Sequence, residues 1–340
     1  MAKRLLHTLP LPLATLAALT RAGYETADDV DTSTPEELAR DARISLFSSQ
    51  AVFSATQASR TPALTQNVAS MTQNSSRRYP TGCPPMDELL EGGFKRGSIL
   101  EISGPPGVAT EAFAVNIARE FVRDGEGLIF ASMHNSITAA QLLDLIRPED
   151  DADLTHDYMS LVSHTSLFTI ADVLVFLHRL PSYLQSSRKT ALLVLNSFSL
   201  AFYSLSPNVS HASRAAFHER IRQALAQACA SAGISVVVTT QLSTKLVNAD
   251  GSPATFDTGA RAVMIPQPGS AYLPGGRSYR LMVAPRSRYE GTIQLLATPT
   301  HVYQPGQAPL REKRYEMVRT SGPDGRRRDV YSFTEEGPEG

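Results

Sequence analysis

A loop rich in glycine and proline, placed between an apolar strand and an amphipathic helix, is the segment of this sequence best suited to chemistry. The strand is expected over 98–103 and the helix over 111–122. The loop between them begins with Gly104, Pro105, Pro106, Gly107 and Val108. Loops in this context bind phosphate: glycines let backbone amides wrap the anion, a lysine neutralises its charge, and a Ser or Thr hydroxyl holds magnesium.

The second half of the loop lacks the residues that hold a nucleotide. Ala109 stands for the second glycine, Thr110 for the lysine and Glu111 for the hydroxyl residue. A one-residue deletion would move Thr110 to the hydroxyl position, but no lysine occurs between Lys95 and Lys189. A carboxylate at position 111 suits a helix N-terminus but repels a triphosphate. The loop is therefore interpreted as a structural turn that no longer binds ATP.

A second departure follows the buried, apolar strand expected over 191–195. Asn196 comes directly after it, where a phosphate-loop ATPase carries the aspartate that holds the metal-bound water. An amide is neutral and cannot fully replace a carboxylate beside magnesium. The site is thus expected to have lost its metal ligand as well as its lysine.

The elements around this loop predict an α/β fold. From 79 to 303, strands alternate with helices, which is typical of a mainly parallel central sheet flanked by helices. Residues 1–45 are predicted to form a helical N-terminal domain and residues 46–78, rich in Ser, Gln, Thr and Asn, a flexible linker. Residues 304–340 are predicted to form a C-terminal β-hairpin and a basic tail.

Local patterns define one helix and four strands of these regions more closely. Thr34 precedes Pro35, and Glu37 closes a capping box, so a helix is expected to start there. Strands are expected over 279–284 and 292–297 as an antiparallel pair. The hairpin strands are expected over 315–319 and 329–333.

Composition excludes several function classes. The chain has 340 residues, of which 42% are hydrophobic and 19% charged, and its net charge of −1 gives no bulk electrostatic attraction to nucleic acid. Cys83 and Cys229 cannot form a disulfide framework or a zinc site alone, which favours a reducing compartment. The eight histidines show no metal-binding spacing, so no metal site is expected. No apolar run approaches the roughly 18 residues that span a bilayer, so no membrane contact is expected.

Several segments together resemble the eukaryotic Rad-fifty-one paralogs, which are RecA-type proteins of homologous recombination, and the C paralog most. The resemblance covers nearly the whole chain and is carried by residues 9–12, 22–30, 82–93, 101–108, 180–184 and 239–245. It implies a RecA-like core of the phosphate-loop ATPase type and an N-terminal domain like a helix-hairpin-helix bundle.

The resemblance also gives roles to two strand ends. Met133 stands where RecA-type enzymes carry the glutamate that activates water, and a thioether cannot accept a proton. Gln241 matches the glutamine that reports nucleotide state to the DNA-binding loop, while Thr240 replaces the usual asparagine. With lysine, metal carboxylate and general base all replaced, a pseudo-ATPase without catalytic residues is expected. The degenerate pocket comprises Gly104, Pro105, Pro106, Gly107, Val108, Ala109, Thr110, Glu111, Met133, Asn196 and Gln241.

The implied function is that of a recombination mediator in double-strand-break repair. Such paralogs act in complexes with one another, bind single-stranded or branched DNA, and assist loading of the strand-exchange recombinase, mostly in the nucleus. Two alternatives stay open. One is a weak DNA-dependent ATPase subunit, with ATP and magnesium bound only where a partner completes the site; the other is a RecA-fold regulatory scaffold that does not act on DNA.

DNA contacts are expected among the cations of the later strands and loops. Residues 242–272 are predicted to be irregular and stand where the family has its second DNA loop. The candidates for phosphate contact are Lys245, Arg277, Arg280, Arg286 and Arg288. Tyr289 would add base stacking, whereas a solvated face of a strand pair explains the arginines equally well. In the tail, Arg326, Arg327 and Arg328 are interpreted as a nuclear-import element, as a phosphate contact, or as solvent-exposed residues of the predicted turn.

Overall fold

The structure is a computed structural model, and the chain in it divides into two compact units, Met1–Ser70 and Met71–Gly340. It describes residues 6, 9, 11–31, 33–57, 77–147, 158–187, 189–203, 205, 209–248, 254–255, 261–304, 306–321 and 327–334.

The first unit is helical. Its helices are α1 (Leu13–Arg21), α2 (Ala27–Asp31), α3 (Pro35–Asp41) and α4 (Leu46–Gln57). The capping box at the start of α3 is present: the Glu37 amide donates to Thr34 Oγ1 at 3.3 Å, and the Thr34 amide donates to Glu37 Oε2 at 2.9 Å. Leu19, Val30 and Leu38 are fully buried at the centre of the unit.

Helix α4 corrects the predicted start of the linker at residue 46. Val52 is fully buried in the cluster formed by the first three helices, and Ser49 Oγ donates to the carbonyl of Pro35 at 2.6 Å. Few of the apolar side chains of α4 are buried, and its apolar residues do not form a regular stripe along one face of the helix. The helix is therefore difficult to recognise from the sequence. The later part of the predicted linker, residues 58–76, lies outside the described residues.

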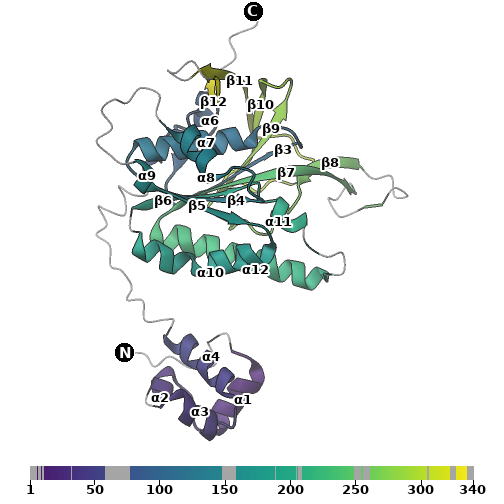
Figure 1. The fold of residues 1–340 in the computed structure, drawn as a ribbon. Coiled ribbons are helices and arrows are strands. Elements are labelled where there is room, and N and C mark those ends of the chain that lie inside the picture. Colours follow the sequence, from purple (N-terminus) through teal and green to yellow (C-terminus); the bar gives the residue numbers. More distant parts are fainter. Residues whose placement is uncertain are drawn as a thin grey trace, which may run out of the picture. The chain divides into compact units, whose positions relative to one another are not determined.

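The second unit is built on a mixed sheet with helices on both faces (Figure 1). Its described strands follow the order β12-β11-β10-β9-β3-β7-β6-β4-β5, and β8 pairs with β7. The strands are β3 (Ile99–Gly104), β4 (Gly127–Met133), β5 (Val162–Leu167), β6 (Thr190–Asn196), β7 (Ser235–Val247), β8 (Arg261–Pro266), β9 (Ser278–Pro285), β10 (Glu290–Ala297), β11 (Arg311–Ser321) and β12 (Arg327–Thr334). All neighbours from β9 to β5 run parallel, which confirms the predicted α/β class.

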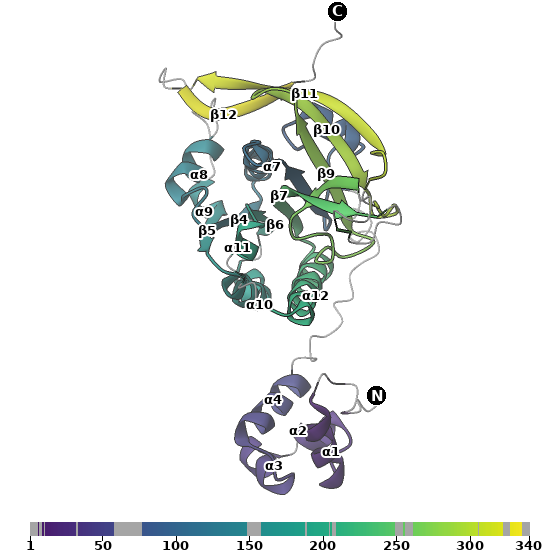
Figure 2. The same cartoon turned by 90° about the vertical axis from the view of Figure 1, so that its right-hand side faces the viewer.

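Three antiparallel strands extend this parallel core. Strand β10 pairs antiparallel with β9, as expected, with Thr292 opposite Ala284. Strand β11 pairs with both β10 and β12, so the hairpin expected near the C-terminus continues the core sheet. Figure 2 shows β11 and β12 curving over the side of the sheet that carries α7 and α8. A separate antiparallel pair joins β1 (Arg78–Tyr79) to β2 (Phe94–Lys95).

Two helical layers cover the sheet (Figures 1 and 2). One layer contains α6 (Pro84–Leu89), α7 (Thr110–Arg123), α8 (Ala139–Ile146) and α9 (Tyr158–Leu161), and the other contains α10 (Ile170–Ser186), α11 (Leu200–Tyr203), α12 (His211–Gln227) and a π-helical turn, η2 (Ala228–Ala232). None of the described helices is long and apolar enough to cross a membrane.

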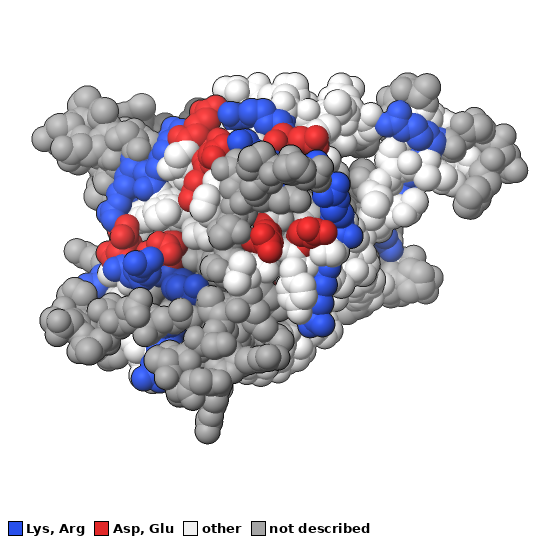
Figure 3. Space-filling view, turned by 90° about the horizontal axis from the view of Figure 1, so that it is seen from above, with Lys and Arg blue, Asp and Glu red and all other residues white. Residues whose placement is uncertain are grey.

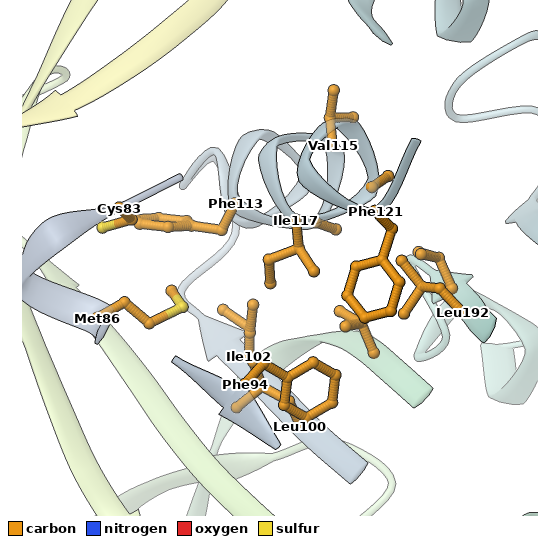
Figure 4. Close-up of a cluster of buried hydrophobic side chains, with 14 of the residues drawn as sticks. Cys83, Met86, Phe94, Leu100, Ile102, Phe113, Val115, Ile117, Phe121 and Leu192 are labelled. Carbon is orange, nitrogen blue, oxygen red and sulfur yellow. The ribbon is translucent and has the colours of Figure 1, made fainter. Parts of the chain in front are cut away.

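Helix α7 is fixed against the sheet by residues four positions apart. Phe113, Ile117 and Phe121 are buried; Figure 4 shows Ile117 and Phe121 pointing toward the sheet and Phe113 lying toward Cys83, whereas Val115 points away. Side chains at this spacing share one helix face, so their burial fixes the rotation of the helix about its axis. The first turn of α7 is thereby held at the carboxyl end of β3.

Candidate functional site at the degenerate loop

The parallel register brings the predicted pocket residues to one edge of the sheet. Gly104 at the end of β3 lies opposite Gln241 in β7, and Asn196 at the end of β6 lies opposite Ser132 in β4. In open parallel sheets, ligands bind beyond the carboxyl ends of the strands, and this is that edge.

The loop packs against its own side chains. Gly104 is needed because an added Cβ would lie 2.9 Å from Thr110 Cγ2 and 3.2 Å from Val108 Cγ1. Thr110, which stands in the lysine position, is 8% exposed. Its methyl group therefore fills the turn, and the side chain has no length to reach a phosphate.

Two backbone amides of the loop are already used inside it. The Val108 amide donates to the Pro105 carbonyl at 3.1 Å, and the Thr110 amide donates to the Val108 carbonyl at 2.8 Å. A phosphate-binding loop instead points its amides at the anion. Gly107 has the left-handed conformation, with φ of +90°, so the loop forms a tight turn while two of its amides bond within it.

Glu111 is bound by neutral donors from the end of β6. Asn196 Nδ2 donates to Glu111 Oε1 at 3.2 Å, and Ser197 Oγ donates to the same oxygen at 2.7 Å. Asn196 Nδ2 also donates to Ser136 Oγ at 2.9 Å, while its Oδ1 accepts from Thr239 Oγ1 at 2.9 Å. The Asn196 side chain, which is fully buried, is therefore satisfied at both ends.

Ser197 is held in a conformation that favours glycine. Its φ is +56°, in the left-handed region. Its amide donates to Thr239 Oγ1 at 2.6 Å and its hydroxyl donates to Glu111, so both ends of the residue are fixed. Unusual backbone held by such bonds is common at sites that have, or had, a function.

These departures depend on one another. An aspartate at 196 could not donate to Glu111 and would place a second negative charge beside it. Asparagine at 196 thus suits glutamate at 111, which also suits the N-terminus of α7. The residues present do not fit a magnesium–nucleotide complex, because the lysine and the metal carboxylate are replaced and a carboxylate takes the hydroxyl position.

Met133 and Gln241 have different surroundings. Met133 is fully buried in the hydrophobic cluster beneath the sheet, so its side chain is part of the core. The Gln241 amide donates to Ser199 Oγ at 2.7 Å, and Tyr203 OH donates to Gln241 Oε1 at 3.3 Å. Gln241 therefore joins β7 to α11 and the residues just before it.

The prediction that Arg280 contacts DNA is wrong. It is buried, and its Nε lies 2.7 Å from Oε2 of Glu101, which is fully buried in β3. Tyr272 OH donates to the other oxygen of Glu101 at 2.5 Å. The positive charge of Arg280 is therefore paired with Glu101 inside the protein.

The remaining cations are spread over the second unit. Lys245 is exposed on β7, Arg277 Nη1 approaches the Gly97 carbonyl at 3.5 Å, and the Arg288 guanidinium lies 5.5 Å from the centroid of the Tyr289 ring. Arg286 lines a polar hollow of about 330 Å³ with residues of β10 and β11. On the face seen from above, Lys and Arg side chains of the described residues lie beside those of Asp and Glu (Figure 3).

The segment expected to be irregular, 242–272, begins as a β-ribbon. Strands β7 and β8 pair antiparallel, with Lys245 opposite Val263. The second half of β7 is difficult to recognise as a strand from the sequence, because several of its positions are exposed and carry polar residues. Residues 249–253 and 256–260 lie outside the described residues, as does Arg326; of Arg327 and Arg328 only the backbone, in β12, is described.

Sequence reasoning missed the hydroxyl residues that complete the site. Ser136, Ser197 and Thr239 supply three of its hydrogen-bonding groups. Ser197 directly follows the strand-end asparagine, and a polar residue at that position was the available indication. Ser136 gives none, because only the turn after β4 brings it to Asn196.

No protein-family model matches the chain. Over 100 residues the chain is 26% identical to the DNA repair protein RadA of Mycolicibacterium smegmatis (strain ATCC 700084 / mc(2)155). This stretch is 29% of the chain, and it spans about a fifth of the RadA protein, 20% of its length. The parallel sheet and this similarity together support a RecA-like core for the second unit.

Proposed function

We propose that the protein is a non-catalytic, RecA-like subunit of DNA repair by homologous recombination. It acts in the nucleus with other recombinase paralogs and helps the strand-exchange recombinase to load on single-stranded or branched DNA. The similarity to a DNA repair protein supports the repair and recombination class, and the sequence resemblance to the C paralog supports the mediator role.

One observation carries the non-catalytic part of the proposal. The Glu111 carboxylate accepts hydrogen bonds from Asn196 and Ser197 at the place where a nucleotide site needs cations. Phosphoryl transfer depends on positive charge at the β- and γ-phosphates and on a carboxylate-held magnesium. A site with the opposite charge has no means to stabilise that transition state.

A nucleotide titration tests this part. Binding of ATP with magnesium to the full chain is measured by calorimetry, and we expect a Kd of about 1 mM or weaker. Thr110→Lys should not restore binding, because the new ammonium would lie next to Glu111 and pair with it. A micromolar Kd for the unaltered chain would overturn the proposal, and the same titration with a recombinase partner present tests completion of the site in trans.

A complementation experiment tests the role in repair. Cells that lack the gene are expected to repair double-strand breaks poorly and to be rescued by the unaltered chain. Glu111→Gln should rescue equally, because it changes the charge of the loop but keeps an oxygen that accepts from Ser197. Normal break repair in the deleted cells would contradict the proposed function.

A further inference from the structure

A cavity of about 440 Å³ lies between α12 and the β7–β8 ribbon. Phe202, Arg214, His218, Lys245 and Gln267 are among the residues that line it. Its size is within the range of small-ligand sites. The loop residues and Asn196 are not among its lining residues, so it is separate from the degenerate site.

One wall of the cavity is aromatic. The rings of Phe202 and His218 lie with centroids 5.4 Å apart at 51° to each other, and Phe202 is itself supported by Phe198 at 5.3 Å. Burial and then the nearby Lys245 lower the pKa of His218, which keeps its imidazole neutral at physiological pH. Two neutral rings at a cavity wall offer a stacking surface to a planar heterocycle.

The charges at the cavity favour an anion. Arg214 in the first turn of α12 and Lys245 on β7 are both exposed. The one carboxylate among the lining residues, Glu219, is bound by Arg222 at 2.6 Å and by Gln223 Nε2 at 2.5 Å. The acidic charge is thus compensated outside the cavity, while two cations remain at its rim.

The cavity also contains an acceptor without a donor. Gln267 Oε1 is buried and has no hydrogen-bond partner among the residues that the structure describes. A buried acceptor left unbonded is unfavourable, and native proteins rarely keep one without a reason. An N–H group of a bound molecule would satisfy it.

We propose that this cavity holds one nucleotide unit. The base lies against Phe202 and His218 and donates an N–H to Gln267 Oε1, while its phosphate lies at Arg214 and Lys245. The inference rests on the proposed function, because a single DNA strand is one source of such a unit; a free nucleotide is the other.

Binding of a fluorescent single-stranded oligonucleotide of mixed sequence to the full chain tests this, with anisotropy measured over a salt series. Arg214→Gln and Lys245→Gln should each weaken binding, and the double variant should reduce the slope of log affinity against log salt by roughly 0.7, the value for one lost phosphate contact on a single strand. The matched control is Arg220→Gln, on the same helix but not among the cavity-lining residues, and it should change neither quantity.

Gln267→Met separates a binding role from a structural one. It should weaken binding about fivefold, as expected for one hydrogen bond, and leave the thermal stability of the free protein unchanged or higher because an unbonded acceptor is removed. Competition with deoxyadenosine monophosphate tests the free nucleotide, and 2-deoxyribose 5-phosphate tests whether the base is needed. Equal competition by the two would overturn the assignment of the base.

The outcomes distinguish the cavity from the proposed function. Equal oligonucleotide affinity in all the cavity variants overturns the cavity and leaves the mediator role intact. Binding of deoxyadenosine monophosphate that is lost in Lys245→Gln, without any oligonucleotide binding, supports the cavity and contradicts the DNA-binding part of the function. Binding of neither probe overturns both.

Discussion

Glu101 in β3 and Glu111 in the first turn of α7 are two carboxylates on either side of the same loop, and they are held in opposite ways. Glu101 is fully buried and meets a full positive charge, Arg280, together with the hydroxyl of Tyr272. Glu111 is half-buried, and its hydrogen-bond donors among the described residues, Asn196 and Ser197, are neutral. The first carboxylate is part of the sheet framework, and the second lies at the loop where the sequence predicts a degenerate nucleotide pocket.

The difference shows on which of the two groups the sheet depends. The Glu101 group joins β3, β9 and the loop before β9, so it fixes strands on which the sheet depends. The Glu101 carboxylate raises the pKa of Arg280 although burial opposes this, and burial raises the pKa of Tyr272 well above its usual value. At physiological pH, Arg280 is therefore charged and Tyr272 is neutral. The Glu111 group joins the end of β6 to the first turn of α7, and Asn196 adds bonds to Ser136 and to Thr239 in β7. It contains no buried ion pair among the described residues, so changes at Glu111 should disturb the sheet less than changes at Glu101.

Arg280→Met is expected to have the largest effect. It leaves the Glu101 carboxylate buried without its cation, and breaking a buried pair in this way costs about 3–5 kcal/mol. The free energy of unfolding, measured by urea denaturation, should fall by that amount. A loss no larger than that of an exposed arginine would contradict the structural role given to this pair.

The matched double variant makes the comparison sharper. Replacing both partners, Glu101→Leu with Arg280→Met, should be less harmful than Arg280→Met alone, because no unpaired charge is left in the core. The same denaturation experiment measures it. Additive losses in the double variant would show that the two side chains do not act as a pair.

The sequence predicts the Glu111 region better than the Glu101 region for a physical reason. The strand, loop and helix from 98 to 122 are continuous in the chain, and the apolar strands before Met133 and Asn196 are recognisable by their composition. In a parallel sheet the carboxyl ends of these strands must meet at one edge, so the sequence predicts that these residues lie close together.

The Glu101 group could not be predicted because its members are distant in the sequence. Glu101 meets Arg280 only through the parallel pairing of β3 with β9, in which the two residues are register partners. Without that register Arg280 is one of several arginines, which is why it was expected to contact DNA. Helix α4 was missed for a related reason, since Val52 is its only apolar residue that is fully buried among the described side chains.

Asn196→Asp is expected to have an intermediate effect. It removes a donor to Glu111 and places a second carboxylate against it, with a cost of roughly 1–2 kcal/mol from the lost hydrogen bond and the repulsion. Urea denaturation at neutral pH measures the loss. Adding Glu111→Gln should recover most of the stability, because the glutamine amide can donate to the new aspartate. No recovery would indicate that Asn196 acts through Ser136 or Thr239 instead.

Glu111→Gln alone is expected to have the smallest effect, and it tests whether the degenerate site still contributes to stability. The glutamine oxygen can still accept from Ser197, so the change removes mainly the negative charge at the start of α7, which is worth about 0.3–1 kcal/mol at an exposed helix end. The loss should shrink in high salt, because screening weakens the interaction of an accessible charge with the helix. A loss of several kcal/mol, independent of salt, would place Glu111 in the same class as Glu101 and remove the distinction between the two carboxylates.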